Sequence, residues 1–175
     1  VAVDAGTDYR QQTIQRLTRY HVPAGSQADE AMNLSFLQLA EAPEEDPRIV
    51  VEQRELRALK RAAGVVWFDF KTLCGGPRSQ NDYLELAARF HTVLLSNVPR
   101  MSAGMASEAR RFTWLVDVLY DRHVKLVISA AVPATELYIE GPLSHEFPRT
   151  VSRLNEMQSD AFWAKGRRDV DTSLT

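Results

Sequence analysis

TVLLSNVPRMSAGMASEARRFTWLVDVLYDRHVKLVISAA, residues 92–131, is the stretch of sequence that decides the fold. It begins with a continuous apolar run, Thr92-Val93-Leu94-Leu95, which is typical of a strand buried on both faces. It ends with a second such run, Val124-Lys125-Leu126-Val127-Ile128. Residues 108–123, between the runs, carry an apolar stripe at helical spacing, made of Phe112, Leu115, Val116, Leu119 and Tyr120. Strand, helix and strand at this spacing predict a parallel βαβ unit with a right-handed crossover.

The same pattern continues toward the N-terminus. The run from Val65 to Phe70 predicts another strand, and Gly75-Gly76-Pro77 interrupts the chain after it. Ser79 can then cap a helix, with Asp82 as its capping-box partner. We therefore predict the α/β class, with a parallel βαβαβ unit over about residues 65–131, flanking helices and a small N-terminal α+β segment.

The sequence divides into four parts. Residues 1–29 contain two turn-like clusters and little regular periodicity. Residues 30–64 predict a small α+β connector, and residues 65–163 predict the α/β domain, because the strand and helix patterns lie there. Residues 164–175 are polar and charged, so we expect a disordered tail.

Two helices flank the parallel unit in this prediction. Asp29 can cap the first, which runs to about Ala40. The second covers residues 147–163, with Pro148 tolerated in its first turn. Between the first helix and the domain, Ile49-Val50-Val51 predicts a strand, whereas residues 54–63 fit a short strand or a turn of helix equally well.

Composition limits the classes of protein to which the chain can belong. It has 175 residues, of which 45% are hydrophobic and 25% charged, ordinary values for a folded domain. Twenty-one basic residues against 23 acidic ones give a net charge of −2, which argues against a nucleic-acid binder. Cys74 is the single cysteine, so no internal disulfide forms. With no long apolar run and no export leader in the sequence, we expect a cytoplasmic protein.

Motifs for self-contained catalysis are missing from the 175 residues. There is no Gly-x-x-x-x-Gly-Lys-Ser/Thr phosphate loop and no Gly-x-Gly-x-x-Gly. The four histidines lack metal-ligand spacing. Although Ser, His and Asp residues are present, no Gly-x-Ser-x-Gly elbow supports a hydrolase triad. We therefore predict no catalytic residue and no metal site in this chain.

Four arginines are candidate anion ligands. Arg110, Arg111, Arg149 and Arg153 fall in the early turns of two predicted helices, where the helix dipole disfavours positive charge. Such arginines need a carboxylate or a phosphate. One interpretation places them near a nucleotide or at an interdomain surface. The other pairs them with acidic neighbours, namely Glu108, Asp117, Glu140 or Glu146.

Two predicted strands end alike. Leu95-Ser96-Asn97-Val98-Pro99 and Ile128-Ser129-Ala130-Ala131-Val132-Pro133 both continue from an apolar run through Ser to Val-Pro. Parallel strands that share a sheet edge can simply end in similar turns. Alternatively, Ser96, Asn97 and Ser129 line a crevice at the carboxyl edge, where α/β proteins bind ligands.

Long ordered motifs give the chain a resemblance over about residues 1–162. The motifs are DAGTDYR (4–10), FDFKTLCGGPRSQNDY (68–83), RFHTVLL (89–95), ARRF (109–112), LVD (115–117), LYD (119–121), VKL (124–126), SA (129–130) and RTVSRLNEMQS (149–159). They are similar to the C-terminal portion of the ZapE cell-division ATPases, bacterial relatives of the mitochondrial Afg-one (LACE-type) AAA+ ATPases. In that family, residues 1–29 would follow the nucleotide-binding core.

The resemblance implies a P-loop ATPase that uses ATP and magnesium when intact. The phosphate loop and the Walker B pair lie upstream in the family, so we expect this chain to be a C-terminal part that is inactive alone. The implied partners are the N-terminal ATPase part and a division-ring protein, with a peripheral association at the inner membrane. Alternatively, the chain is a protein-interaction module for division-ring or membrane-bound clients, with no nucleotide role of its own.

Overall fold

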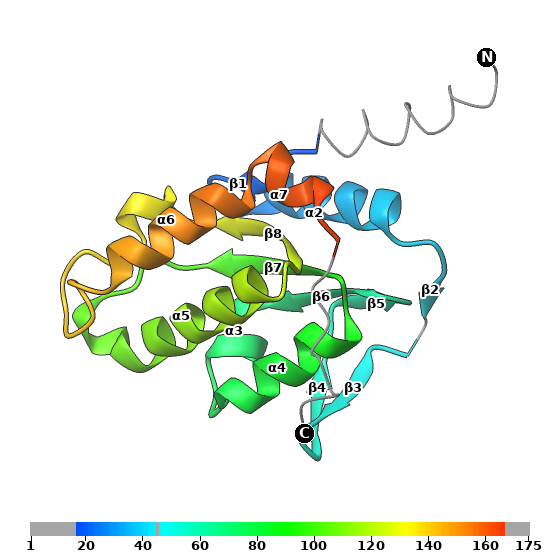
Figure 1. Ribbon diagram of the computed structural model, residues 1–175, viewed down its shortest axis with the longest axis horizontal. Coiled ribbons are helices and arrows are strands. Elements are labelled where there is room, and N and C mark those ends of the chain that lie inside the picture. Colours follow the sequence, from blue (N-terminus) through cyan, green and yellow to red (C-terminus); the bar gives the residue numbers. More distant parts are fainter. Residues whose placement is uncertain (1–16, 45, 167–175) are drawn as a thin grey trace.

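A six-stranded sheet forms the centre of the computed structural model, which describes residues 17–44 and 46–166 (Figure 1). The strand order is β1-β8-β7-β6-β5-β2, and a separate hairpin pairs β3 with β4. The strands are β1 (Tyr20–His21), β2 (Pro43–Glu44), β3 (Arg48–Val51), β4 (Arg54–Arg57), β5 (Lys60–Ala62), β6 (Val65–Asp69), β7 (Thr92–Val98) and β8 (Lys125–Ala130).

The parallel unit predicted from the sequence is confirmed. β6, β7 and β8 run parallel, with Leu94 opposite Trp67 on one side and Val127 on the other. Leu95 is fully buried, as are Val93 and Val127, because helices cover both faces of these strands. The antiparallel strands β5 and β2 extend the sheet beyond β6.

Helices lie on both sides of the sheet (Figure 1). α2 packs against β6, β7 and β8, and its Phe36 ring lies 6.3 Å from that of Trp67. On the other face, α4 packs against α5 and α5 packs against α6. The helices are α2 (Ser26–Leu39), α3 (Phe70–Cys74), α4 (Gln80–Arg89), α5 (Ala106–Asp121), α6 (Phe147–Met157) and α7 (Asp160–Ala164), with 3₁₀ turns at Ala103–Met105 and Ala134–Glu136.

Several predicted boundaries differ from the structure. α2 begins at Ser26 with Gly25 as its N-cap, so the prediction that Asp29 caps it is wrong. α5 begins two residues earlier than predicted, because a 3₁₀ turn leads into it. The last helix is broken after Met157, since the Ser159 hydroxyl accepts a hydrogen bond from the Phe162 amide and starts α7.

The N-terminal segment contributes more than its pattern suggested. β1 adds to the sheet beside β8, with Tyr20 opposite Ile128, although two residues give no periodicity to detect. Residues 54–63 hold strands β4 and β5, which decides the alternative that the sequence left open. The turn cluster at residues 4–8 and the predicted tail beyond residue 166 lie outside the described residues.

Candidate functional site

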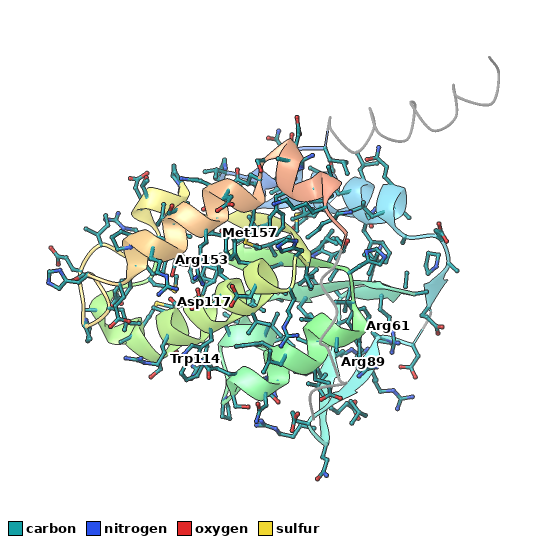
Figure 2. The ribbon with its side chains drawn as sticks, in the orientation of Figure 1. Arg61, Arg89, Trp114, Asp117, Arg153 and Met157 are labelled. Carbon is teal, nitrogen blue, oxygen red and sulfur yellow. The ribbon has the colours of Figure 1, made fainter. Side chains whose placement is uncertain are left out.

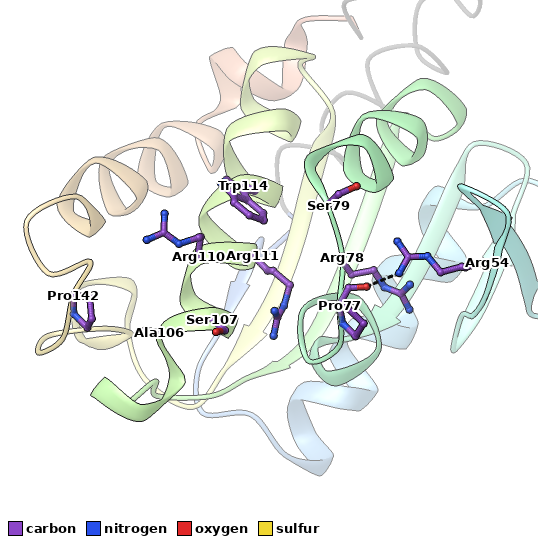
Figure 3. A pocket seen from close by; sticks show the side chains of 10 residues that line it. All are labelled: Arg54, Pro77, Arg78, Ser79, Ala106, Ser107, Arg110, Arg111, Trp114 and Pro142. Carbon is purple, nitrogen blue, oxygen red and sulfur yellow. Dashed lines mark hydrogen bonds between the residues drawn. The ribbon is translucent and has the colours of Figure 1, made fainter.

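A pocket of about 710 Å³ lies between the first turns of α5 and the loop that joins α3 to α4 (Figure 3). Its floor and walls come from parts of the chain far apart in sequence: the β3–β4 hairpin, the α3–α4 loop, α5 and the segment before α6. The residues that line it are Arg54, Pro77, Arg78, Ser79, Ala106, Ser107, Arg110, Arg111, Trp114 and Pro142.

Four of these lining residues are arginines and none is acidic. In Figure 3, Arg111 lies between α5 and the loop, Arg78 points from the loop toward Arg54 on its far side, and Arg110 points from α5 away from Arg111, on the side of Pro142. The positive groups therefore form a row along the pocket. We call the pocket with its ten lining residues the arginine pocket.

Two of the four arginines are held by backbone carbonyls. The Nε of Arg111 donates to the Cys74 carbonyl over 2.7 Å, and Glu108 lies 3.8 Å from its Nη2. Arg54 donates to the Pro77 carbonyl over 2.9 Å and to the Asp82 carboxylate over 3.0 Å. These bonds clamp the two ends of the α3–α4 loop and fix both guanidinium groups in place.

The other two arginines have no such partners. No hydrogen bond or ion pair joins Arg78 or Arg110 to any residue of 17–44 and 46–166. The Nε of Arg78 is moreover buried without an acceptor. Because a buried, charged donor costs free energy when it is unpaired, this position favours an anionic ligand.

The loop beside the pocket has its shape for local reasons. A side chain at Gly75 would place its Cβ 2.5 Å from the Lys71 carbonyl oxygen, so only glycine fits there. The predicted capping box is confirmed: the Ser79 amide donates to the Asp82 carboxylate over 2.7 Å, and the Ser79 side chain accepts in return. The buried Asp82 carboxylate thus caps α4 and also forms an ion pair with Arg54.

Arg153 and Arg149, the other predicted arginines, lie away from the pocket. Arg153 pairs with Asp117 across the contact of α5 and α6 (Figure 2), and its guanidinium stands 4.9 Å over the Tyr120 ring. Tyr120 in turn donates to Glu156 over 2.6 Å. Arg149 is exposed on the first turn of α6 and is not among the pocket's lining residues.

The sheet-edge candidates Ser96, Asn97 and Ser129 form hydrogen bonds within the sheet. The Ser96 hydroxyl accepts from the Trp67 indole over 2.6 Å, and the Ser129 hydroxyl accepts from the Asn97 amide over 3.0 Å. The Asn97 side chain donates to Asp69 over 2.8 Å. Asn97 has φ 65°, at the register shift between β7 and β8. These polar groups tie the strand ends together across the carboxyl edge.

Cys74, whose backbone carbonyl accepts the hydrogen bond from Arg111, is fully buried. Burial raises the pKa of its thiol to about 12, against a smaller opposing effect of the Tyr83 hydroxyl, which is 3.9 Å away. The group is therefore a neutral thiol near pH 7, which gives it a packing role.

Sequence reasoning found Arg110 and Arg111 but missed Arg54 and Arg78. Arg78 directly follows Gly75-Gly76-Pro77, which was the available signal, whereas nothing near Arg54 points to a site. In the described part of the chain no group of three or more metal-ligating side chains comes together. Among the same residues, no helix is long and apolar enough to cross a membrane.

Comparisons with known proteins agree on one family. Residues 1–166 match the AFG1-like ATPase family. The chain is 43% identical over 161 residues to cell division protein ZapE of Escherichia coli K12, covering 91% of this chain and 43% of that protein. It is 31% identical over 204 residues to lactation elevated protein 1 homolog B of Danio rerio, covering 96% and 41%. The chain thus spans less than half the length of these curated relatives. No solved structure shows significant similarity.

Proposed function

The chain belongs to the AFG1-like ATPase family, and we propose that it forms the C-terminal part of an AAA+-like P-loop ATPase that acts in bacterial cell division. The name of the Escherichia coli relative supports the division role, and the family supports the use of ATP and magnesium. The 175 residues contain no Walker loop. In this proposal, the nucleotide and its metal are held by the other part of the protein, in the cytoplasm at the division site.

The arginine pocket carries the proposal. Phosphoryl transfer depends on positioning and on neutralising the negative charge that is spread over the transferring phosphate. Guanidinium groups bind phosphate oxygens in a bidentate manner, and those held rigidly beforehand need no reorganisation. Arg54 and Arg111 are held in that way, while Arg78 and Arg110 keep their donors for a ligand. We place this pocket against the ATP phosphates of the nucleotide-binding part.

The test uses the intact protein. Arg110→Gln and Arg78→Gln should each lower ATP turnover by about tenfold or more, because each removes a charge-assisted bond worth about 1.5–3 kcal/mol. The matched control is Arg57→Gln, an exposed arginine on β4 outside the pocket. Turnover that falls equally in the control, or in none of the variants, would contradict the proposal.

Two of the predicted arginines extend this test. Arg111→Ala should lower turnover and also loosen the loop at Cys74, because its Nε holds that carbonyl. Arg149→Ala should lower turnover only if the first turn of α6 also faces the nucleotide-binding part. The melting temperature of each variant separates a lost contact with nucleotide from a lost contact within the fold.

The 175-residue chain itself should not hydrolyse ATP. Catalysis requires the backbone amides, lysine and magnesium site of a phosphate loop, and the sequence contains no such loop. Magnesium-dependent turnover by the pure chain, abolished by chelation, would show that this part of the proposal is wrong.

A second candidate function is a protein-interaction module for division-ring or membrane-bound clients. It is favoured by Leu34 and Leu37, which α2 leaves 60% and 53% exposed. Leu34→Ser with Leu37→Ser should then abolish client binding and leave ATP turnover unchanged. The reverse outcome, lost turnover with intact client binding, would contradict this second candidate.

A further inference from the structure

We propose that the arginine pocket binds the phosphate chain of a free polyphosphate by itself, without a Walker loop. The choice of phosphate as the anion rests on the proposed function, whereas the existence of the site rests on the geometry of this chain. The pocket would then recognise phosphate without the nucleotide-binding part of the protein.

Charge is the first argument. The four lining arginines face two nearby carboxylates, and each of these is already paired: Asp82 with Arg54 and Glu108 with Arg111. Asp82 is buried, so it adds little competition at the pocket surface. The remaining charge, carried by Arg78 and Arg110, is balanced by no residue of the described chain. A multiply charged anion would complete the balance.

Preorganisation is the second argument. The Arg111 side chain is only 16% exposed and is fixed through Nε, and because Glu108 lies 3.8 Å from Nη2, Nη1 is the nitrogen left for a ligand. Arg54 is fixed from the other side by the Pro77 carbonyl. An anion that enters the pocket therefore meets two guanidinium groups whose ordering entropy is already lost.

Shape is the third argument, and it separates a phosphate chain from other anions. The guanidinium groups are spread along the pocket from Arg54 to Arg110, so a single small oxyanion would reach only some of them (Figure 3). A volume of about 710 Å³ is that of a small-molecule site. The half-buried Trp114 ring lines the same space and offers a face for a base or a guanidinium. A nucleoside polyphosphate fits the spread of the guanidinium groups, the volume and the Trp114 ring, whereas an acidic peptide uses only the charge.

Trp114 also provides the measurement. Fluorescence of the 175-residue chain is followed during titration with inorganic tripolyphosphate, without magnesium and at low salt, and heat of binding is measured in parallel. We expect saturable one-to-one binding. Arg78→Gln and Arg110→Gln should each weaken binding about tenfold at an unchanged melting temperature, since each removes one charge-assisted bond. Arg57→Gln should bind as the unsubstituted chain does, and Trp114→Phe should abolish the fluorescence change while the heat of binding remains.

Parallel titrations identify the source of the phosphate. ATP that binds more tightly than tripolyphosphate indicates a nucleotide, and equal affinities indicate the phosphate chain alone; both support the proposal. Tighter binding of a hexaglutamate peptide would overturn it in favour of a protein partner. Absence of binding, or binding unaffected by both substitutions in the pocket, would also overturn it. If tripolyphosphate binds but Arg110→Gln leaves turnover of the intact protein unchanged, the proposed function fails and this inference stands.

Discussion

The arginines at the two ends of α5 have different surroundings. At its first turns, Arg110 and Arg111 border a pocket in which no carboxylate is among the lining residues. Near its other end, Asp117 receives Arg153 from α6, and Tyr120 lies under the same guanidinium. Arginine therefore has two roles around this helix: Arg153 joins α5 to α6 near one end, whereas Arg110 leaves positive charge available to a ligand at the other.

The difference shows what a charged side chain contributes in each setting. An arginine with a carboxylate and an aromatic ring around it adds to stability, because its desolvation is offset within the fold. An arginine without such partners adds little to stability and attracts an anion from outside. The following predictions separate these two roles, in order of decreasing effect.

The largest effect is expected in the sheet that supports both ends of α5. Leu95→Ala should lower the free energy of unfolding by about 2–5 kcal/mol, because Leu95 is fully buried between β6 and β8. Denaturant unfolding measures the loss, with Leu34→Ala on the exposed face of α2 as the control. Tripolyphosphate affinity per folded molecule should stay unchanged. An altered affinity would mean that the pocket is not an independent unit of the fold.

Removal of one carboxylate tests the comparison directly. Asp117→Ala should lower the free energy of unfolding by about 1–3 kcal/mol, because it leaves the mostly buried Arg153 guanidinium without its ion pair. Arg110→Ala, which breaks no ion pair, should change it by at most about 0.5 kcal/mol. Thermal and denaturant melts of both variants decide the matter. Equal losses in the two variants would erase the distinction between the ends of α5.

Salt should weaken anion binding at the arginine pocket more than it weakens the Arg153–Asp117 ion pair. Raising sodium chloride from about 0.05 to 0.5 M shortens the Debye length severalfold and should weaken tripolyphosphate binding by about tenfold or more. The Arg153–Asp117 pair is partly buried and in direct contact, so its contribution to stability should change much less. A double-mutant cycle at both salt concentrations measures the pair. A cycle energy that falls as steeply as the affinity would contradict the comparison.

The smallest effect concerns Cys74, whose backbone carbonyl accepts the hydrogen bond from Arg111. Because burial raises its folded pKa to about 12, above the value of 9.0 for an ordinary thiol, the folded state favours the neutral form. That contribution is complete below pH 9 and is lost as the pH rises further, by about 1 kcal/mol at pH 9.5. Denaturant unfolding at pH 8 and 9.5 should show a smaller drop for Cys74→Ala. An identical drop would mean that other groups cause the alkaline loss.

The amino-acid sequence by itself determined the parallel unit and its core. Apolar runs at Val65, Thr92 and Val124, joined by helical stripes, favour parallel strands with helices packed on the sheet, because side chains of a buried strand point to two faces that must both be covered. The capping box at Ser79 follows from residues close in sequence. Local chemistry of this kind is visible in a single stretch of chain.

Only the tertiary structure decided which arginines meet. Arg54 and Arg111 are 57 positions apart in the numbering, and no local pattern relates them; the α3–α4 loop joins them because both donate to its carbonyls. Likewise, Asp117 and Arg153 become partners only where α5 packs against α6. Electrostatic partners are set by distance in space, and that distance exists only after the sheet and helices have packed.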